Sequence, residues 1–308
     1  MRVNSRRSRA LIVTLAIGLV ILAVLSAGCE PEDYQKPIRQ FQDASKVVIS
    51  ATEALLKNMN TIEQNHEVDQ RIFEKRDLNL PEINKLEIIS PTEIKIRTNA
   101  LHALAQYTTN LAELAQGKPA ASVGDSTAKL GTSLDQLAED AKSLQVTRSF
   151  FDNNPRFGGA LSSAGSAIGM VAQLMMKNKA RRVIEQSIVD NDPAVTQLLD
   201  LIGEDANAAY QRQKNALGYF GTIASKAYQD ELGRNPDPVE LLNFAVMIKA
   251  YRAQVAQLAD PSNAISKMRK AHDALVACVK SHKNPTAISE LNSAVMDFVN
   301  AVRPLAAI

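Results

Sequence analysis

The sequence predicts an all-α protein, an elongated antiparallel bundle of about eight helices. Three observations predict this fold. Hydrophobic residues make up 45% of the chain but aromatic residues only 5%, with no tryptophan, so alanine and leucine must form most of the core, as in closely packed helices. Apolar residues recur at three- and four-residue spacing, the period of a helix with one buried face. Several prolines directly follow an aspartate or asparagine, as at helix starts.

In the first half of the chain, we expect a helix from Pro37 to about Lys75, followed by a break over residues 76–89. The alternation at Lys85–Ile89 is also compatible with a short strand. Ser90-Pro91-Thr92-Glu93 has the pattern of a capping box with proline at the first helical position, and Gly117-Lys118-Pro119 ends the helix that starts there. The next helix is marked by one stripe: Leu130, Leu134, Leu137, Ala141 and Leu144.

In the second half, Asn153-Asn154-Pro155 breaks the chain, and a helix from about Gly158 to Val189 follows. Further helix starts are expected at Asp192-Pro193, Asn235-Pro236-Asp237-Pro238, Asp260-Pro261 and Asn284-Pro285. The bundle domain covers residues 37–308, with a possible boundary between two sub-bundles near residues 190–193. The last helix has the most regular stripe: Ile288, Leu291, Val295, Phe298, Val302 and Leu305.

The first 28 residues have the pattern of an export signal. Residues 1–9 are rich in arginine, residues 10–25 are apolar, and small residues follow. The apolar stretch is short for a membrane span of ~20 residues. Removal of residues 1–28 leaves 31 basic and 33 acidic residues, so the remaining chain is close to neutral and has no bulk electrostatic reason to bind nucleic acid.

Leu25-Ser26-Ala27-Gly28-Cys29 resembles the lipobox of bacterial lipoproteins. The resemblance implies cleavage before Cys29, lipidation of its sulfur with diacylglycerol, often with a further acyl chain such as palmitate, and anchoring in the cell envelope. Residues 29–36 would form the lipidated tether. Glu30, in place of aspartate, favours the periplasmic face of the outer membrane over the inner membrane. Two alternatives stay open: ordinary secretory cleavage that leaves a free cysteine, and an uncleaved anchor.

Residues that could carry chemistry are scarce. No His-Glu-x-x-His, Gly-x-Ser-x-Gly or phosphate-binding glycine loop occurs, and none of the four histidines is paired with a carboxylate at ligand spacing. His272 and Asp273 are adjacent and are expected to point apart. The carboxylate pairs, Glu204-Asp205 among them, are interpreted as solvated helix faces, and Cys278 as a buried apolar residue. The sequence therefore predicts no catalytic residues, no cofactor and no metal site.

One basic cluster comprises Lys177, Lys179, Arg181 and Arg182. It has no interleaved aromatic residues, which argues against nucleic acid as a ligand. A solvated helix face is one interpretation, and contact with a lipid headgroup or an anionic wall polymer is the other.

Residues 157–176 contain no charged side chain and include Gly165-x-x-x-Gly169. Length, lack of charge and flanking basic residues are typical of a membrane-spanning helix. Glycine, serine and glutamine lower its hydrophobicity, however. We therefore favour a central helix that is buried all round, whose small residues allow its neighbours to approach closely.

Taken together, these patterns predict a membrane-anchored envelope lipoprotein that binds a partner, either another envelope component or a second copy of itself, and is not an enzyme. The alternative is a membrane-active helical protein that inserts residues 157–176, as helical pore-formers do. The pattern Ile96-Arg97-x-x-Ala-Leu-x-Ala-Leu-x-x-Tyr107 is also loosely similar to uncharacterised helical bacterial lipoproteins, a resemblance that implies no particular activity.

Overall fold

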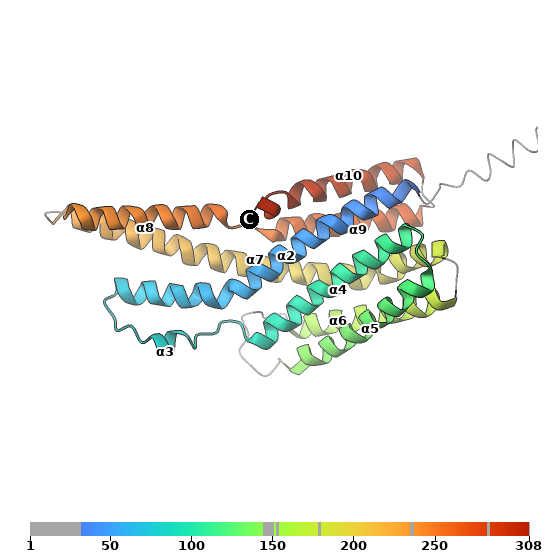
Figure 1. Cartoon of the computed structure of the whole chain (residues 1–308), viewed down its shortest axis with the longest axis horizontal. Helices are drawn as coiled ribbons and strands as arrows, with labels where there is room; N and C mark the ends of the chain where they lie inside the picture. Colours follow the sequence, from blue (N-terminus) through green and yellow to red (C-terminus); the bar gives the residue numbers. More distant parts are fainter. Residues whose placement is uncertain are drawn as a thin grey trace, which may run out of the picture.

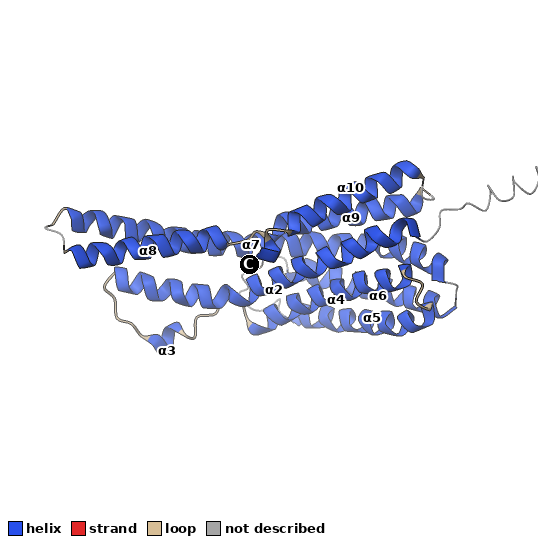
Figure 2. Cartoon of the chain, turned by 45° about the horizontal axis from the view of Figure 1, so that its top comes forward, coloured by secondary structure: helices blue, strands red, loops and turns tan. Residues whose placement is uncertain are grey.

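The computed structural model describes residues 32–143, 151, 154–177, 180–234, 237–281 and 284–307. Over these residues the protein is all-α, as predicted, with eight helices of 18 to 53 residues and one single-turn helix (Figures 1 and 2). The elements are α2 (Glu32–Phe73), α3 (Leu80–Ile83), α4 (Pro91–Ala115), α5 (Ala120–Ser143), α6 (Asn154–Lys177), α7 (Ala180–Leu232), α8 (Pro238–Gln257), α9 (Pro261–Lys280), α10 (Pro285–Val302) and the 3₁₀ turn η2 (Leu305–Ala307).

Long helices that run in alternating directions give the molecule its elongated shape (Figure 1). We call the thicker end the body: there the first half of α7 packs against α6, α9 and α4, while α2 packs against α4 and α10. We call the thinner end the arm: it consists of the second half of α7, the antiparallel α8, and the last turns of α2 beside them.

The capping residues begin four helices where the sequence predicts them. The Ser90 hydroxyl accepts a hydrogen bond from the Glu93 amide, and the Glu93 carboxylate accepts one from the Ser90 amide. The side chains of Asp237, Asp260 and Asn284 accept hydrogen bonds from the first turns of α8, α9 and α10. In each case proline follows the cap, where its missing N–H has no helical partner to lose.

The helix start predicted at Asp192-Pro193 is wrong. Pro193 lies inside α7, which continues for 53 residues. Proline removes one backbone hydrogen bond from a helix interior, but Ala194, Val195, Leu198 and Leu199 are all buried in the body. We infer that this packing holds the helix together across the proline, so the chain forms no new helix at residues 190–193.

The single helix predicted over residues 158–189 is also wrong, because α6 ends at Lys177 and α7 begins at Ala180. The predicted tether differs as well: residues 32–36 already belong to α2, and acidic residues in this first turn favour a helix N-terminus.

Helix α6 contains residues 157–176. The prediction that this helix is buried all round is wrong. One face, with Phe157, Leu161, Ala164 and Ile168, is buried, whereas Met170 is 59% exposed. Among the residues of this segment whose side chains the structure describes, the other exposed ones are Gly159, Ser163 and Ser166. The described part of its solvent face therefore consists of small residues and Met170, none of them charged. Over the described residues, no helix combines the length and hydropathy needed to cross a bilayer.

Close backbone contact explains the small residues between α5 and α6. A Cβ atom on Gly131 would lie 3.1 Å from the Gly165 carbonyl oxygen and 3.1 Å from the Gly169 nitrogen. A Cβ atom on Gly165 would lie 3.0 Å from the Gly131 carbonyl oxygen, whereas one on Gly169 would meet nothing within 4 Å. Close approach is predicted at both glycines of the Gly165-x-x-x-Gly169 pattern. It leaves no room for a side chain at Gly165 but leaves room for one at Gly169. On α5, it leaves no room for a side chain at Gly131.

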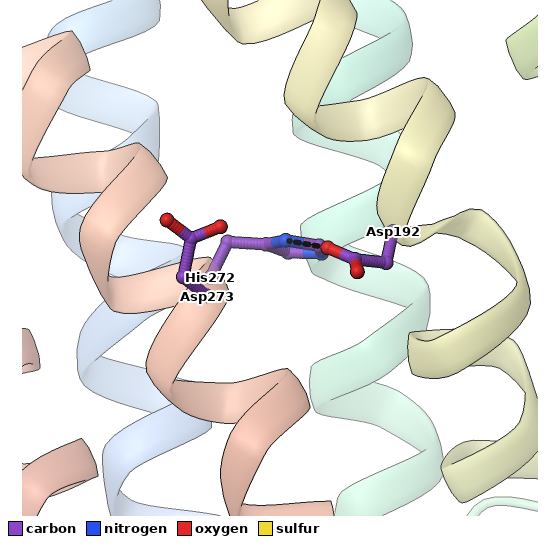
Figure 3. Close-up of side chains that lie close together, drawn as sticks. All are labelled: Asp192, His272 and Asp273. Atoms are coloured by element: carbon purple, nitrogen blue, oxygen red, sulfur yellow. Dashed lines mark ion pairs between the residues drawn. The ribbon is translucent and has the colours of Figure 1, made fainter. Parts of the chain in front are cut away.

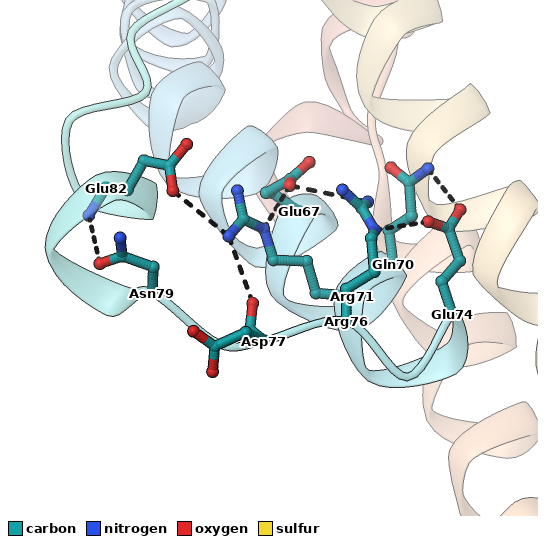
Figure 4. A network of polar contacts seen from close by, with 8 residues as sticks. All are labelled: Glu67, Gln70, Arg71, Glu74, Arg76, Asp77, Asn79 and Glu82. Atoms are coloured by element: carbon teal, nitrogen blue, oxygen red, sulfur yellow. Dashed lines mark hydrogen bonds and ion pairs between the residues drawn. The ribbon is translucent and has the colours of Figure 1, made fainter.

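The segment after α2 forms no strand at residues 85–89. Instead, polar side chains of α2 bind its backbone: the Asn60 carboxamide oxygen accepts from the amides of Ile88 and Ile89, and its nitrogen donates to the Ile89 carbonyl. At the end of α2, the Arg71 guanidinium contacts Glu67, Glu82 and the Asp77 carbonyl (Figure 4). Backbone groups that would pair in a strand are therefore satisfied by side chains.

The predicted stripe of the last helix is confirmed from Leu291 to Val302, whereas Ile288 is only partly buried and the buried Leu305 lies beyond the helix, in η2. Leu291, Val295, Phe298 and Val302 are buried, and the Phe298 ring packs 5.7 Å from that of Phe41 on α2. Cys278 is also buried, at 2% exposed, as predicted.

Candidate functional site

A buried polar cluster lies where α4, α7 and α9 meet in the body. His272 on α9 is fully buried, and its Nε2 lies 3.1 Å from the hydroxyl oxygen of Tyr107 on α4. Its Nδ1 faces Asp192 on α7, 3.6 Å from the carboxylate Oδ1 (Figure 3). Three helices thus contribute one polar side chain each to a region that is otherwise apolar.

Burial controls the charge of this cluster. It lowers the pKa of His272 to about 4, although the nearby Asp192 carboxylate acts in the opposite direction. Burial, together with Asp192, raises the pKa of the Tyr107 hydroxyl well above its usual value. At neutral pH the imidazole and the phenol are therefore both uncharged, and one ring nitrogen of His272 carries a lone pair in place of a proton.

Two further charged residues complete the cluster. A carboxylate oxygen of Asp273 lies within 4.8 Å of ligand atoms of both Asp192 and His272. The Lys280 amine lies 3.8 Å from the other oxygen of Asp192. His272 therefore has a carboxylate neighbour that the sequence did not predict, Asp192 of α7, whereas the Asp273 carboxylate lies on the other side of the imidazole, as expected for adjacent residues of one helix (Figure 3).

A second buried polar pair also contradicts the sequence interpretation. Asp205 on α7 is not on a solvated face: its Oδ2 accepts a hydrogen bond of 2.6 Å from the Arg97 Nε on α4, and both side chains are buried. The Arg97 guanidinium also lies 3.9 Å from the centroid of the Phe151 ring and 5.1 Å from that of Phe157. This pair joins two helices, and its chemistry is that of a structural ion pair.

Both missed clusters carried a signal in the sequence. Arg97 lies four residues before Leu101 and seven before Leu104, on one helical stripe, and His272 occupies the same stripe as Met268 and Leu275. A polar residue on an apolar stripe is expected to be buried and paired. The sequence could have predicted burial of Arg97 and His272 in this way, but not their partners.

The structure describes the side chain of none of the predicted site residues. Cys29 precedes the first described residue, and Lys179 lies in the gap between α6 and α7. Lys177, Arg181 and Arg182 belong to described helices, but their side chains are not among the described ones. The anionic contact predicted for these four residues therefore stays a prediction.

The arm presents an apolar surface that the sequence analysis did not single out. Helix α8 has 20 residues, none of them buried, and apolar residues on every side. Helix α8 packs along α7. Its own Tyr251 donates a 2.7 Å hydrogen bond from the hydroxyl to Asp69 of α2, and the Tyr251 ring packs on Phe220 of α7. On its outer face Val239 and Leu242 are 64% exposed and Val246 is 56% exposed.

Two open grooves lie on other surfaces. One, of 620 Å³, runs between α4 and α5 past His102, Lys129 and Asp140. The other, of 610 Å³, lies where α2 meets the α8–α9 connection and η2, and it is mainly apolar. Tyr107, Asp192 and His272 line neither groove. The buried polar cluster therefore does not line either groove.

Comparison with family models, with curated proteins and with solved structures yields no match for this chain. The fold defines the protein only as an elongated all-α bundle with a projecting arm.

Proposed function

We propose that this chain is a lipid-anchored protein of the bacterial envelope that acts by binding a partner through its arm, and not by catalysis. The observation that carries the proposal is α8: a helix with apolar residues on every side and no buried residue. A helix of this composition is ordinarily covered on all sides. Contiguous exposed apolar residues on a folded protein mark a site of interaction.

The spacing of the exposed residues indicates what kind of partner fits. Val239, Leu242 and Val246 are separated by three and four residues, so they form one row along the helix. A row of this kind packs into the groove of a facing helix. The proposed partner is therefore an amphipathic helix of another envelope protein. The lipid on Cys29, which the lipobox resemblance supports, would keep the protein at the membrane while the arm binds.

Site-specific photo-crosslinking in the native host tests the arm as a binding surface. A photoreactive amino acid at Leu242 should yield one defined adduct, whereas the same amino acid at Met170, an apolar residue of α6 that is 59% exposed, should yield none. In cells that also carry a tagged second copy of the chain, the adduct should not contain the tag.

The variant with both Leu242→Glu and Val246→Glu should lose partner binding and keep its melting temperature, because both side chains are more than half exposed. Met170→Glu is the matched control, and it should change neither property. Equal adducts from residues 242 and 170, or full binding by the double variant, would contradict the proposal. An adduct between two copies would make self-association the function of the arm.

A further inference from the structure

The imidazole of His272 has one buried nitrogen without a partner. Nε2 is occupied by the Tyr107 hydroxyl, but Nδ1 has no hydrogen-bond partner among the described residues, although the side chain is fully buried. A buried polar atom that lacks a hydrogen-bond partner destabilises the fold. Such an atom in a well-packed body needs an explanation, and a bound ion supplies one.

The position of Nδ1 relative to Asp192 fits two ligands of one metal ion better than it fits a hydrogen bond. The Nδ1–Oδ1 distance is 3.6 Å, longer than the ~2.7–3.2 Å of N–H···O hydrogen bonds. Two ligand atoms that each lie ~2.1 Å from a tetrahedral ion are separated by about 3.4 Å. Asp273, whose side chain is exposed, offers a third ligand atom within 4.8 Å of both, and its carboxylate, which lies on the other side of the imidazole from Asp192, would turn toward the ion (Figure 3).

The charges around these residues favour a cation. Asp192 and Asp273 bring two carboxylates next to the imidazole, and a third carboxylate nearby, Asp200, is paired with Arg269 at 3.2 Å. Lys280 lies 3.8 Å from Asp192, but its side chain is 56% exposed and can turn into solvent.

Tyr107 provides the support that metal-bound histidines usually have. With a metal ion on Nδ1, the proton of the imidazole is on Nε2, which then donates to the Tyr107 oxygen 3.1 Å away. A hydrogen bond from the second ring nitrogen fixes the tautomer and the ring orientation of a metal ligand. Tyr107 is itself buried on α4, so it is a positioning residue and not a ligand.

We propose that His272 Nδ1, Asp192 and Asp273 bind one first-row divalent metal ion, for which zinc is the probe, between α7 and α9. One imidazole with carboxylates suits these metals, whereas magnesium and calcium prefer oxygen ligands alone. With three protein ligands, the fourth position of a tetrahedral ion is left for water.

The place of this site in the fold indicates a purpose. Asp192 directly precedes Pro193, which has no amide to bond to the carbonyl of Val189, so α7 lacks a backbone hydrogen bond there. A metal ion held by Asp192 on α7 and by two residues of α9 would join the two helices at this weak point.

Calorimetric titration of the chelator-treated full chain, purified in detergent, tests the site. Zinc should bind with one-to-one stoichiometry and raise the melting temperature as its concentration increases. Asp192→Asn and Asp273→Asn should each weaken the affinity at least tenfold. Tyr107→Phe should weaken it about tenfold while the stoichiometry stays at one. The X-ray absorption spectrum of the zinc complex should show nitrogen and oxygen ligands and no sulfur.

His102 provides the matched control. It is a surface histidine whose Nε2 lies 3.4 Å from Glu53 Oε2, and its side chain is 61% exposed. His102→Gln should leave zinc binding unchanged, whereas His272→Gln should abolish it. Asp273→Asn is the decisive variant because its exposed side chain can change without loss of the fold. No saturable binding, or equal affinity for the wild type and Asp273→Asn, would overturn the proposal.

Discussion

At the scale of single residues, the neighbours Glu204 and Asp205 show how much environment matters. Glu204 forms an exposed pair with Arg156, at 3.1 Å, whereas Asp205 forms a buried pair with Arg97, at 2.6 Å. An exposed pair contributes little because water solvates both ions. Removal of one partner from a buried pair leaves the other charge uncompensated in the interior.

We therefore predict that Asp205→Asn lowers the free energy of unfolding by ~3–5 kcal/mol, and that Glu204→Gln lowers it by less than ~1 kcal/mol. Urea denaturation of both variants measures the difference. Similar midpoints for the two would mean that the Arg97–Asp205 pair contributes no more than a surface contact.

The proposed membrane attachment depends on Cys29. Cells given an alkyne fatty acid should label the wild-type protein and leave Cys29→Ser unlabelled, since the thiol accepts the lipid. The Cys29→Ser protein should also be released from the membrane fraction, because it would lack the acyl chains that we propose as the anchor. Cys278→Ser is the control and should keep the label. A wild-type protein without label would refute the lipobox interpretation.

At the scale of elements, the contact between α5 and α6 depends on two glycines whose backbones touch. Gly131→Ala and Gly165→Ala should each lower the free energy of unfolding by roughly 1–3 kcal/mol, because the added methyl group meets backbone of the other helix. Gly169→Ala should instead be neutral or raise it by up to about 1 kcal/mol, since that position has room and alanine favours helix. Thermal or urea unfolding compares the three. Equal effects at Gly165 and Gly169 would contradict the close approach.

The elements also show what a sequence can and cannot predict. Helix starts at Ser90 and Asn284 and the stripe that ends at Val302 depend on residues close together in the chain, so local rules were sufficient. Asp192-Pro193 has the same local pattern, but tertiary packing overrides it. The Tyr107–His272 contact joins residues 165 positions apart. No local pattern predicts such a partner, even where burial can be predicted.

At the scale of the whole molecule, the arm and the body should differ in local stability. Helices α8 and α9 both have 20 residues, but only α9 has buried ones, nine in all. Few buried contacts lower the free energy of local opening. Hydrogen exchange followed by mass spectrometry should therefore show faster exchange in α8 than in α9. Equal protection in the isolated protein would mean that another surface, such as a second copy, already covers the arm.

The length of α7 has a consequence for where a partner can be met. With 53 residues at ~1.5 Å each, the helix spans about 80 Å. The start of α2, the end nearest Cys29 in sequence, and the turn between α7 and α8 lie at opposite ends of the molecule (Figure 1). A lipid on Cys29 would hold the first end at the bilayer. The protein would then act as a spacer that presents its arm far above the membrane surface, where it meets components that a protein lying flat on the lipid does not reach.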